Sequence, residues 1–160
     1  MKKLRIAMVL TAVAAAGMTV STAHAAFSGK VCNLLTSKQV AAVHVSPLKC
    51  TPQKSFGSAY STNYSGTWGA IRGLGPHLTV VVVLYKNTTY FQAAKNNLKL
   101  GYTKKVSGIG SAAYESYGGV LAQMSFVVGR YIATLNLRTS KSLKSVAAFN
   151  ALAKVIAKQL

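Results

Sequence analysis

Apolar and polar residues alternate in two neighbouring segments near the end of the chain, over residues 120–128 and 131–138. An alternation with a period of two is the pattern of a half-buried strand. The two segments are joined by Gly129-Arg130, and a glycine in the first position is typical of a two-residue hairpin turn. We therefore predict a β-hairpin over these residues.

Residues 78–85 are continuously apolar and rich in valine, which predicts a central strand with both faces at least partly covered. The preceding stretch, residues 51–77, is polar and rich in Gly, Ser and Tyr. Its glycines favour a loop over residues 65–76, while residues near 56–64 fit an edge strand. Residues 106–114 predict a tight glycine turn that leads into another strand.

A short helix is expected to begin at Thr36, because Thr36 and Gln39 fit a capping box. It must end before Pro47, so it is too short to be stable alone in water. The only two cysteines, Cys32 and Cys50, flank it. In an exported chain this predicts a disulfide, which would stabilise the fold by about 3 kcal/mol. Two free buried thiols are the alternative.

Two longer segments, residues 89–98 and 142–159, have the apolar spacing of amphipathic helices. The order is helix, strands, helix, three strands, helix. It predicts an α+β fold: a single antiparallel sheet of about four to five strands with three helices packed mainly on one face. Because no repeat or linker divides the chain, residues 26–160 are expected to form one monomeric domain.

Residues 1–25 have the pattern of a signal peptide. Positive residues precede an Ala-rich apolar stretch, and Ala23-His24-Ala25 forms a small-x-small cleavage site. The apolar stretch is too short for a stable membrane span. We therefore expect a periplasmic or secreted protein without a transmembrane anchor.

The charge of the chain is extreme, with 19 Lys and Arg against one acidic residue, Glu115. Removal of Lys2, Lys3 and Arg5 with the signal peptide leaves a formal charge of +15. Three explanations compete. The favoured one is an acidic environment, where carboxylates are mostly neutral and support few ion pairs. The others are a polyanionic partner and neutral drift.

The lack of carboxylates excludes several kinds of chemistry. With no Asp and one Glu, a paired-carboxylate glycosidase, a carboxylate two-metal centre and a calcium loop cannot be built. A Ser-His-Asp triad has no Asp, and neither His44 nor His77 stands in metal-ligand spacing with another ligand. The glycine pair in Gly108-Ile109-Gly110 fits a tight turn rather than a dinucleotide loop. We expect no enzymatic activity, no cofactor and no metal.

Binding is the remaining class of function. Aromatic residues and an arginine in the glycine-rich stretch are suited to stacking on sugars or bases. They are Tyr60, Tyr64, Trp68 and Arg72. Two lysines just before the predicted turn over residues 106–114, and the lysines of the predicted last helix, form a candidate anion patch. They are Lys104, Lys105, Lys144, Lys154 and Lys158.

Several short motifs carry a family resemblance. They are Cys32-x-Leu34-Leu35-Thr36, then Val40-Ala41-Ala42, Cys50, and Val106-x-Gly108-Ile109-Gly110-x-x-Ala113-Tyr114, followed by the hairpin and Leu152-Ala153-Lys154. Together they resemble a family of small exported bacterial domains of unknown function, many of them actinobacterial lipoproteins. Some members are similar to the extracellular sensor domain of mycobacterial serine/threonine kinases. The resemblance implies a disulfide-linked α+β domain with a small-ligand or envelope-binding role, and no catalytic residues.

This chain departs from the family pattern where Ser111 replaces a common Asp and Gln39 a usual Glu. Both departures remove an acid, as the composition does elsewhere. The expected function is that of a non-enzymatic exported envelope protein, structural or small-ligand-binding and adapted to acidic surroundings. The alternative is a cationic protein that binds a polyanion such as nucleic acid, lipopolysaccharide or acidic polysaccharide.

Overall fold

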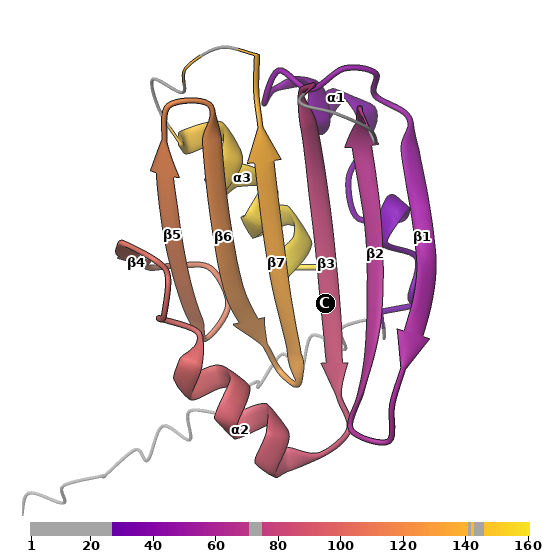
Figure 1. Ribbon diagram of the computed structural model, residues 1–160, viewed down its shortest axis with the longest axis vertical. Helices are drawn as coiled ribbons and strands as arrows, with labels where there is room; N and C mark the ends of the chain where they lie inside the picture. Colours follow the sequence, from indigo (N-terminus) through magenta and orange to yellow (C-terminus); the bar gives the residue numbers. More distant parts are fainter. Residues whose placement is uncertain (1–26, 71–74, 141, 143–145) are drawn as a thin grey trace, which may run out of the picture.

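The computed structural model describes residues 27–70, 75–140, 142 and 146–160, so the predicted signal peptide lies outside the described residues. Seven strands form one antiparallel sheet in the order β1-β2-β3-β7-β6-β5-β4 (Figure 1). The strands are β1 (Cys50–Gly57), β2 (Ser61–Gly69), β3 (His77–Tyr85), β4 (Lys104–Val106), β5 (Ala112–Gly118), β6 (Leu121–Val128) and β7 (Tyr131–Arg138). The helices are η1 (Val31–Asn33), α1 (Ser37–Ala41), α2 (Thr88–Asn97) and α3 (Ala147–Ala157).

The α+β class with a single antiparallel sheet is confirmed, but the predicted number of strands was too small. The difference arises mainly before β3, where β1 and β2 form a hairpin. Residues 65–69 belong to β2, so the loop predicted there was wrong. Every residue of β1 after Cys50 is exposed, which explains why the strand shows no alternating apolar pattern.

The glycines of β2 mark places where the chain is crowded rather than a loop. A Cβ on Gly66 would lie 3.0 Å from Sγ of Cys50 and 3.2 Å from Sγ of Cys32. Gly69 has a φ of 95°, and a Cβ there would lie 2.3 Å from the carbonyl oxygen of Pro76. Glycine is therefore required by close approach within the strand, a role that sequence alone does not distinguish from loop formation.

The hairpin of β6 and β7 is confirmed with the predicted turn. Val128 pairs with Tyr131 across the turn, and Gly129 has a φ of 54°. Arg130 is not among the residues with positive φ, as expected when glycine takes the first position of the turn.

The disulfide and the capping box are also confirmed. Sγ of Cys32 and Sγ of Cys50 are 2.01 Å apart, which ties η1 to the start of β1. The backbone N–H of Gln39 donates to Oγ1 of Thr36 at 3.3 Å, and the N–H of Thr36 donates to Oε1 of Gln39 at 2.8 Å. The resulting helix α1 has five residues, so the sheet and the crosslink must hold it in place.

The two longer helices agree with the prediction within a few residues. The side chain of Asn87 caps α2 by accepting from the N–H of Tyr90 at 3.1 Å. Helix α3 begins at Ala147, later than the predicted start at Ser142, and residues 143–145 lie outside the description. In the described part of the chain, no helix has the length and apolar character needed to cross a membrane.

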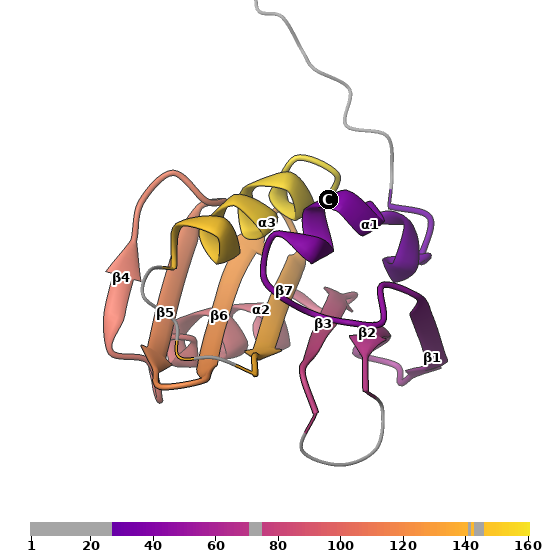
Figure 2. The same cartoon turned by 90° about the horizontal axis from the view of Figure 1, so that it is seen from above.

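The main core lies between the sheet and the layer formed by α1 and α3, which share one face (Figure 2). This face presents the largest buried side chains of the central strands. They include Trp68, Leu78, Val80, Met124, Phe126, Leu135 and Leu137, packed with Val40 of α1 and Phe149 and Ile156 of α3.

Helix α2 packs against the opposite face, so the prediction of helices mainly on one face holds for α1 and α3 but not for α2. Phe91 and Leu98 of α2 are buried against Val127 and Ile132. These two strand residues neighbour core-facing positions and therefore point away from α3. They form an apolar area at the hairpin end of the sheet, and α2 covers it. Among the described residues, no helix covers the opposite end of this face, which carries His77, Gln123, Asn136 and Arg138.

Candidate ligand groove

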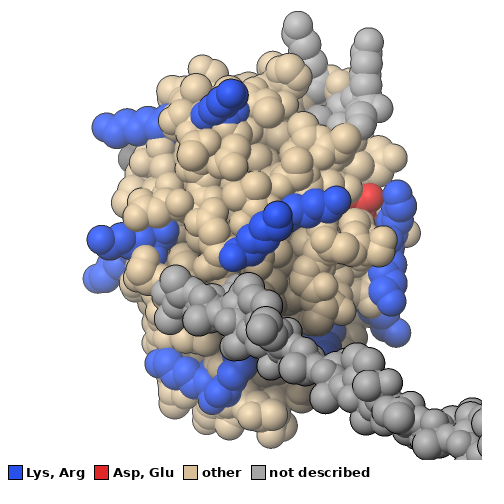
Figure 3. All heavy atoms as spheres, turned by 180° about the vertical axis from the view of Figure 1, so that it is seen from behind, with Lys and Arg blue, Asp and Glu red and all other residues tan. Residues whose placement is uncertain are grey.

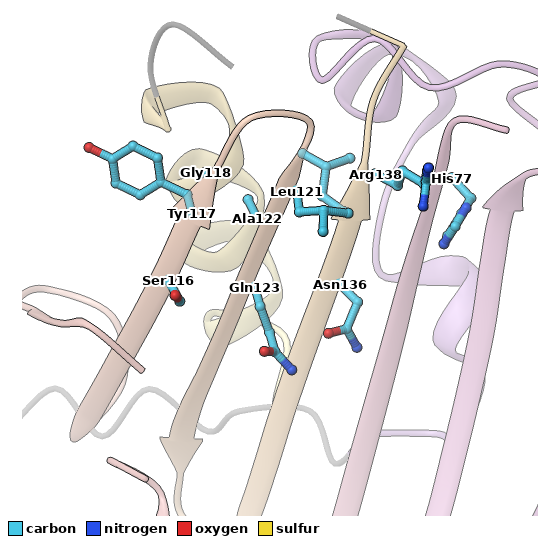
Figure 4. Close-up of a pocket in the computed structure, with 10 residues that line it drawn as sticks. His77, Ser116, Tyr117, Gly118, Leu121, Ala122, Gln123, Asn136 and Arg138 are labelled. Carbon is cyan, nitrogen blue, oxygen red and sulfur yellow. The ribbon is translucent and has the colours of Figure 1, made fainter. Parts of the chain in front are cut away.

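The uncovered face of the sheet carries an open hollow of about 490 Å³ at the end of β3 and β7 that lies away from α2 (Figure 4). Its side-chain walls come from β3, β5, β6 and β7. The residues used below are His77, Ser116, Leu121, Gln123, Asn136 and Arg138, and we call this set the groove.

Strand register explains why these residues meet. His77 is paired with Arg138, and Arg138 is paired with Leu121, so the three form one row across the sheet. Asn136 is paired with Gln123, which is paired with Ser116, and these form the next row. Residues two apart in a strand point to the same side, so both rows share the open face.

The first row is cationic. The guanidinium of Arg138 has no carboxylate partner among the described residues. Nδ1 of His77 lies 2.9 Å from the carbonyl oxygen of Gly75. A carbonyl oxygen only accepts, so Nδ1 carries the hydrogen and Nε2 is the nitrogen left for a ligand. Figure 4 shows the His77 and Arg138 side chains next to each other at the same end of the groove.

The second row supplies uncharged hydrogen-bonding groups. Asn136 and Gln123 each offer an amide donor and acceptor, and Ser116 adds a hydroxyl. The polar strip continues through Thr79, which is paired with Asn136 and whose Oγ1 lies 3.0 Å from Oγ1 of Thr67. Amide and hydroxyl groups in a row suit a ligand that carries several hydroxyl or amide groups.

The apolar part of the groove is small. Leu121 is 53% exposed and closes the first row on the side of β6. Tyr117 is paired with the core-facing Ala122, so its ring points to the other face of the sheet, away from the row of Leu121, Arg138 and His77 (Figure 4). The groove therefore favours a polar ligand over an apolar one.

The single side-chain carboxylate of the chain lies outside the groove. Glu115 is paired with Met124, faces the main core and is 1% exposed. Nζ of Lys104 lies 3.5 Å from its Oε1, and neither carboxylate oxygen has a hydrogen-bond partner among the described residues. Because Glu115 is on the other face of the sheet, it cannot act as a general base on a ligand in the groove.

The aromatic residues proposed from sequence as a ligand site do not come together. Trp68 is 2% exposed in the main core, and Tyr64 packs edge-on against Phe27 with ring centroids 5.5 Å apart. Tyr60 lies at the turn between β1 and β2, where it stacks on Tyr90 at 4.3 Å. Arg72 lies outside the described residues.

The described lysines of the proposed anion patch lie in two different elements, β4 and α3. Lys104 and Lys105 are neighbours in β4, so their side chains point to opposite faces of the sheet. Lys154 lies in α3 and Lys158 caps its end, while Lys144 is outside the described residues. Figure 3 shows Lys and Arg side chains distributed over the rear of the molecule with uncharged surface between them.

Sequence reasoning considered His77 only as a metal ligand and did not identify the other groove residues. The described part of the chain holds no cluster of three or more His, Cys, Asp or Glu that would suit a metal ion. One signal was present: the hairpin turn alone places Gln123 opposite Asn136 and Leu121 opposite Arg138. The pairing of β3 with β7, which adds His77, has no such local signal.

Comparisons with known proteins add no assignment to this site. No family model, no curated protein and no solved structure matches the chain. The resemblance to small exported bacterial domains therefore remains a prediction.

Proposed function

We propose that the chain is an exported, non-enzymatic domain that binds a small polar ligand with an anionic group in the groove. The observation that carries this proposal is the pair formed by Arg138 and His77 on the open face of the sheet. The pair faces a row of amide and hydroxyl groups, and the one acidic side chain lies on the other face. An arginine without a carboxylate partner in a concave polar site is suited to an anion.

A binding role fits the groove better than catalysis. Its side chains offer a guanidinium, an imidazole, amides and a hydroxyl, but no carboxylate and no thiol. The imidazole of His77 is oriented by a backbone carbonyl, and Ser116 lies across the sheet from it on β5. A serine nucleophile would need its base within hydrogen-bond reach.

Export is part of the same proposal. The disulfide between Cys32 and Cys50 is suited to an oxidising compartment. The N-terminal charge and apolar pattern agree with a signal peptide over residues 1–25.

The alternative, binding to a polyanion, is supported by the net charge of +18. Proteins that follow a phosphate backbone concentrate their cations on one face or along one groove. Lys104 and Lys105 point to opposite faces, and the basic residues of the rear surface are dispersed (Figure 3). The arrangement favours the small-ligand proposal.

The test is a titration with glucose 6-phosphate at pH 6 and low ionic strength, followed by backbone amide NMR shifts. We expect shifts at the amides of Gln123, Asn136 and Arg138. Arg138→Gln should weaken binding about tenfold, because a charge-assisted hydrogen bond contributes about 1.5–3 kcal/mol.

The matched control is Lys54→Gln, which removes an equal charge from the exposed edge strand β1. This variant should bind about as tightly as the parent, because surface charges away from a site are screened by solvent and salt. An equal loss of affinity in the two variants would refute the proposal, because the binding would then be a non-specific attraction to positive charge. The absence of amide shifts in the groove would refute it as well.

A further inference from the structure

We infer that the anionic group held in the groove is a sulfate or phosphate ester on a sugar, clamped between Arg138 and a protonated His77 in acidic surroundings. The inference rests on the proposed function and specifies its ligand. It combines two independent observations: the near-absence of acids from the chain and the geometry of the first groove row.

The composition indicates acidic surroundings, and the pH of these surroundings determines which anionic ligands remain charged. A chain with one acidic side chain among 160 residues is suited to acid, where carboxylates of pKa near 4 are mostly neutral. In such surroundings a carboxylate ligand would offer Arg138 no charge. A phosphate ester keeps one negative charge, because only its second ionisation lies near pH 6. A sulfate ester, the conjugate base of a strong acid, also keeps its charge.

The geometry of His77 supports a tetrahedral oxyanion. Its Nδ1–H is engaged with the carbonyl of Gly75, so an added proton must go to Nε2. Arg138 is the register partner on the adjacent strand, roughly 5 Å away along the sheet. A sulfate or phosphate ester has three terminal oxygens. Two suit the fork of Arg138, and the third remains for the imidazolium of His77.

The surroundings of His77 predict the direction of the pH effect. The neighbour on β7 is the cation Arg138, the neighbour on β2 is Gly69, and β6 contributes Leu121 beyond Arg138. Glu115 is on the opposite face, so no described carboxylate faces His77. Protonation of His77 therefore places two positive charges side by side, which a bound anion offsets. Binding is coupled to proton uptake, and affinity rises as the pH falls.

The amide row identifies the rest of the ligand. Gln123 and Asn136 lie directly opposite each other, one strand row below the cationic pair. Their donors and acceptors are suited to the hydroxyl groups of a sugar ring attached to the anion. The groove is open rather than enclosed, so it admits the end of a longer chain as well as a free monosaccharide (Figure 4).

The experiment titrates the purified protein with glucose 6-sulfate, glucose 6-phosphate, glucuronate and glucose at pH 3.0, 5.0 and 7.5, with amide NMR as the readout. The sulfate ester is the primary probe, because its charge is constant over this range. We expect it to bind about tenfold more tightly at pH 5.0 than at pH 7.5, because binding is coupled to the uptake of one proton by His77. Glucuronate should bind less tightly at pH 3.0 than at pH 5.0, because its carboxylate becomes partly protonated, and glucose should bind weakly throughout.

Two variants separate the roles of the cations. His77→Gln should remove the pH dependence of sulfate binding while some affinity remains, and Arg138→Lys should weaken binding because lysine lacks the fork. Lys54→Gln should behave as the parent does. At pH 3.0 both esters should bind more tightly than glucuronate, which supports the inference. The ester that binds more tightly of the two identifies sulfate or phosphate as the preferred group.

The two proposals fail in different ways. If glucuronate binds as tightly as the sulfate ester at pH 3.0, or if His77→Gln retains the pH dependence, the inference is overturned while the proposed function stands. If no anion shifts the groove amides at any pH, the proposed function fails as well.

Discussion

At the scale of single residues, Gly66 shows how one position joins the disulfide to the sheet. It faces both sulfur atoms, and a methyl group between the strand and the crosslink would require the neighbouring atoms to move by a few tenths of an ångström. The close contact holds η1 against β2 through Cys32 and Val31.

We predict that Gly66→Ala destabilises the protein by about 2 kcal/mol, because the added methyl group overpacks the disulfide. Urea denaturation measures the change. The control is Gly118→Ala, because nothing lies within 4 Å of a Cβ at that position. Equal stability of the two variants would mean that the disulfide moves aside at little cost.

Tyr85 gives a second prediction, on stability in alkali. It lies under α2 with its ring centroid 5.9 Å from that of Phe91, and burial raises the pKa of Tyr85 above its ordinary value. Above pH 10 the unfolded tyrosine loses its proton before the folded one, so the unfolded state binds fewer protons. The free energy of unfolding should therefore fall as the pH rises above about 10.

Tyr85→Phe isolates this contribution from the other tyrosines. The difference in free energy of unfolding between parent and variant should be constant at pH 8–10 and should shift in favour of the variant above about pH 10. Urea denaturation at pH 8, 9.5 and 10.5 measures it. A constant difference over the whole range would show that Tyr85 ionises as readily in the folded protein as in the unfolded chain.

At the scale of elements, local patterns explain most of what could be predicted. The β6–β7 hairpin, β3, α2 and the start of α1 each have a signal within a few residues, such as the Gly129 turn or the capping box at Thr36. Strands β1 and β2 lack one. Exposed positions remove the alternation from β1, and glycines required by close contacts in β2 resemble loop residues.

The groove could not be predicted for a different reason. It depends on the pairing of β3 with β7, which are separated in sequence by α2 and three strands. Only this pairing brings His77 beside Arg138. Aromatic residues such as Trp68 were the more obvious candidates, but alternation along β2 directs Trp68 into the main core.

The disulfide gives a prediction at the same scale. Replacing both cysteines, Cys32→Ser with Cys50→Ser, should lower the free energy of unfolding by about 3 kcal/mol, because the crosslink closes a loop with a sequence separation of 18. Urea denaturation measures the loss, and chemical reduction of the parent protein should give a similar value. A loss below about 1 kcal/mol would mean that packing on the sheet alone holds η1 and α1.

At the scale of the whole molecule, the composition leaves few side chains whose charge changes between neutral and acidic pH. The proposed exported form, residues 26–160, carries one acidic side chain, Glu115, and two histidines, His44 and His77. Acid unfolds most proteins because many paired carboxylates must be protonated. Here one such pair is described, between Lys104 and Glu115, and its lysine is 66% exposed.

The inference that the groove holds a sulfate or phosphate ester in acidic surroundings depends on stability in acid. The most direct measurement is the free energy of unfolding by urea at pH 6.5 and pH 2.5, monitored by circular dichroism. We predict the same spectrum and a folded protein at both pH values, because Glu115 is the one acidic side chain whose protonation could weaken the fold. A cooperative loss of structure between pH 6.5 and 2.5 would contradict the account.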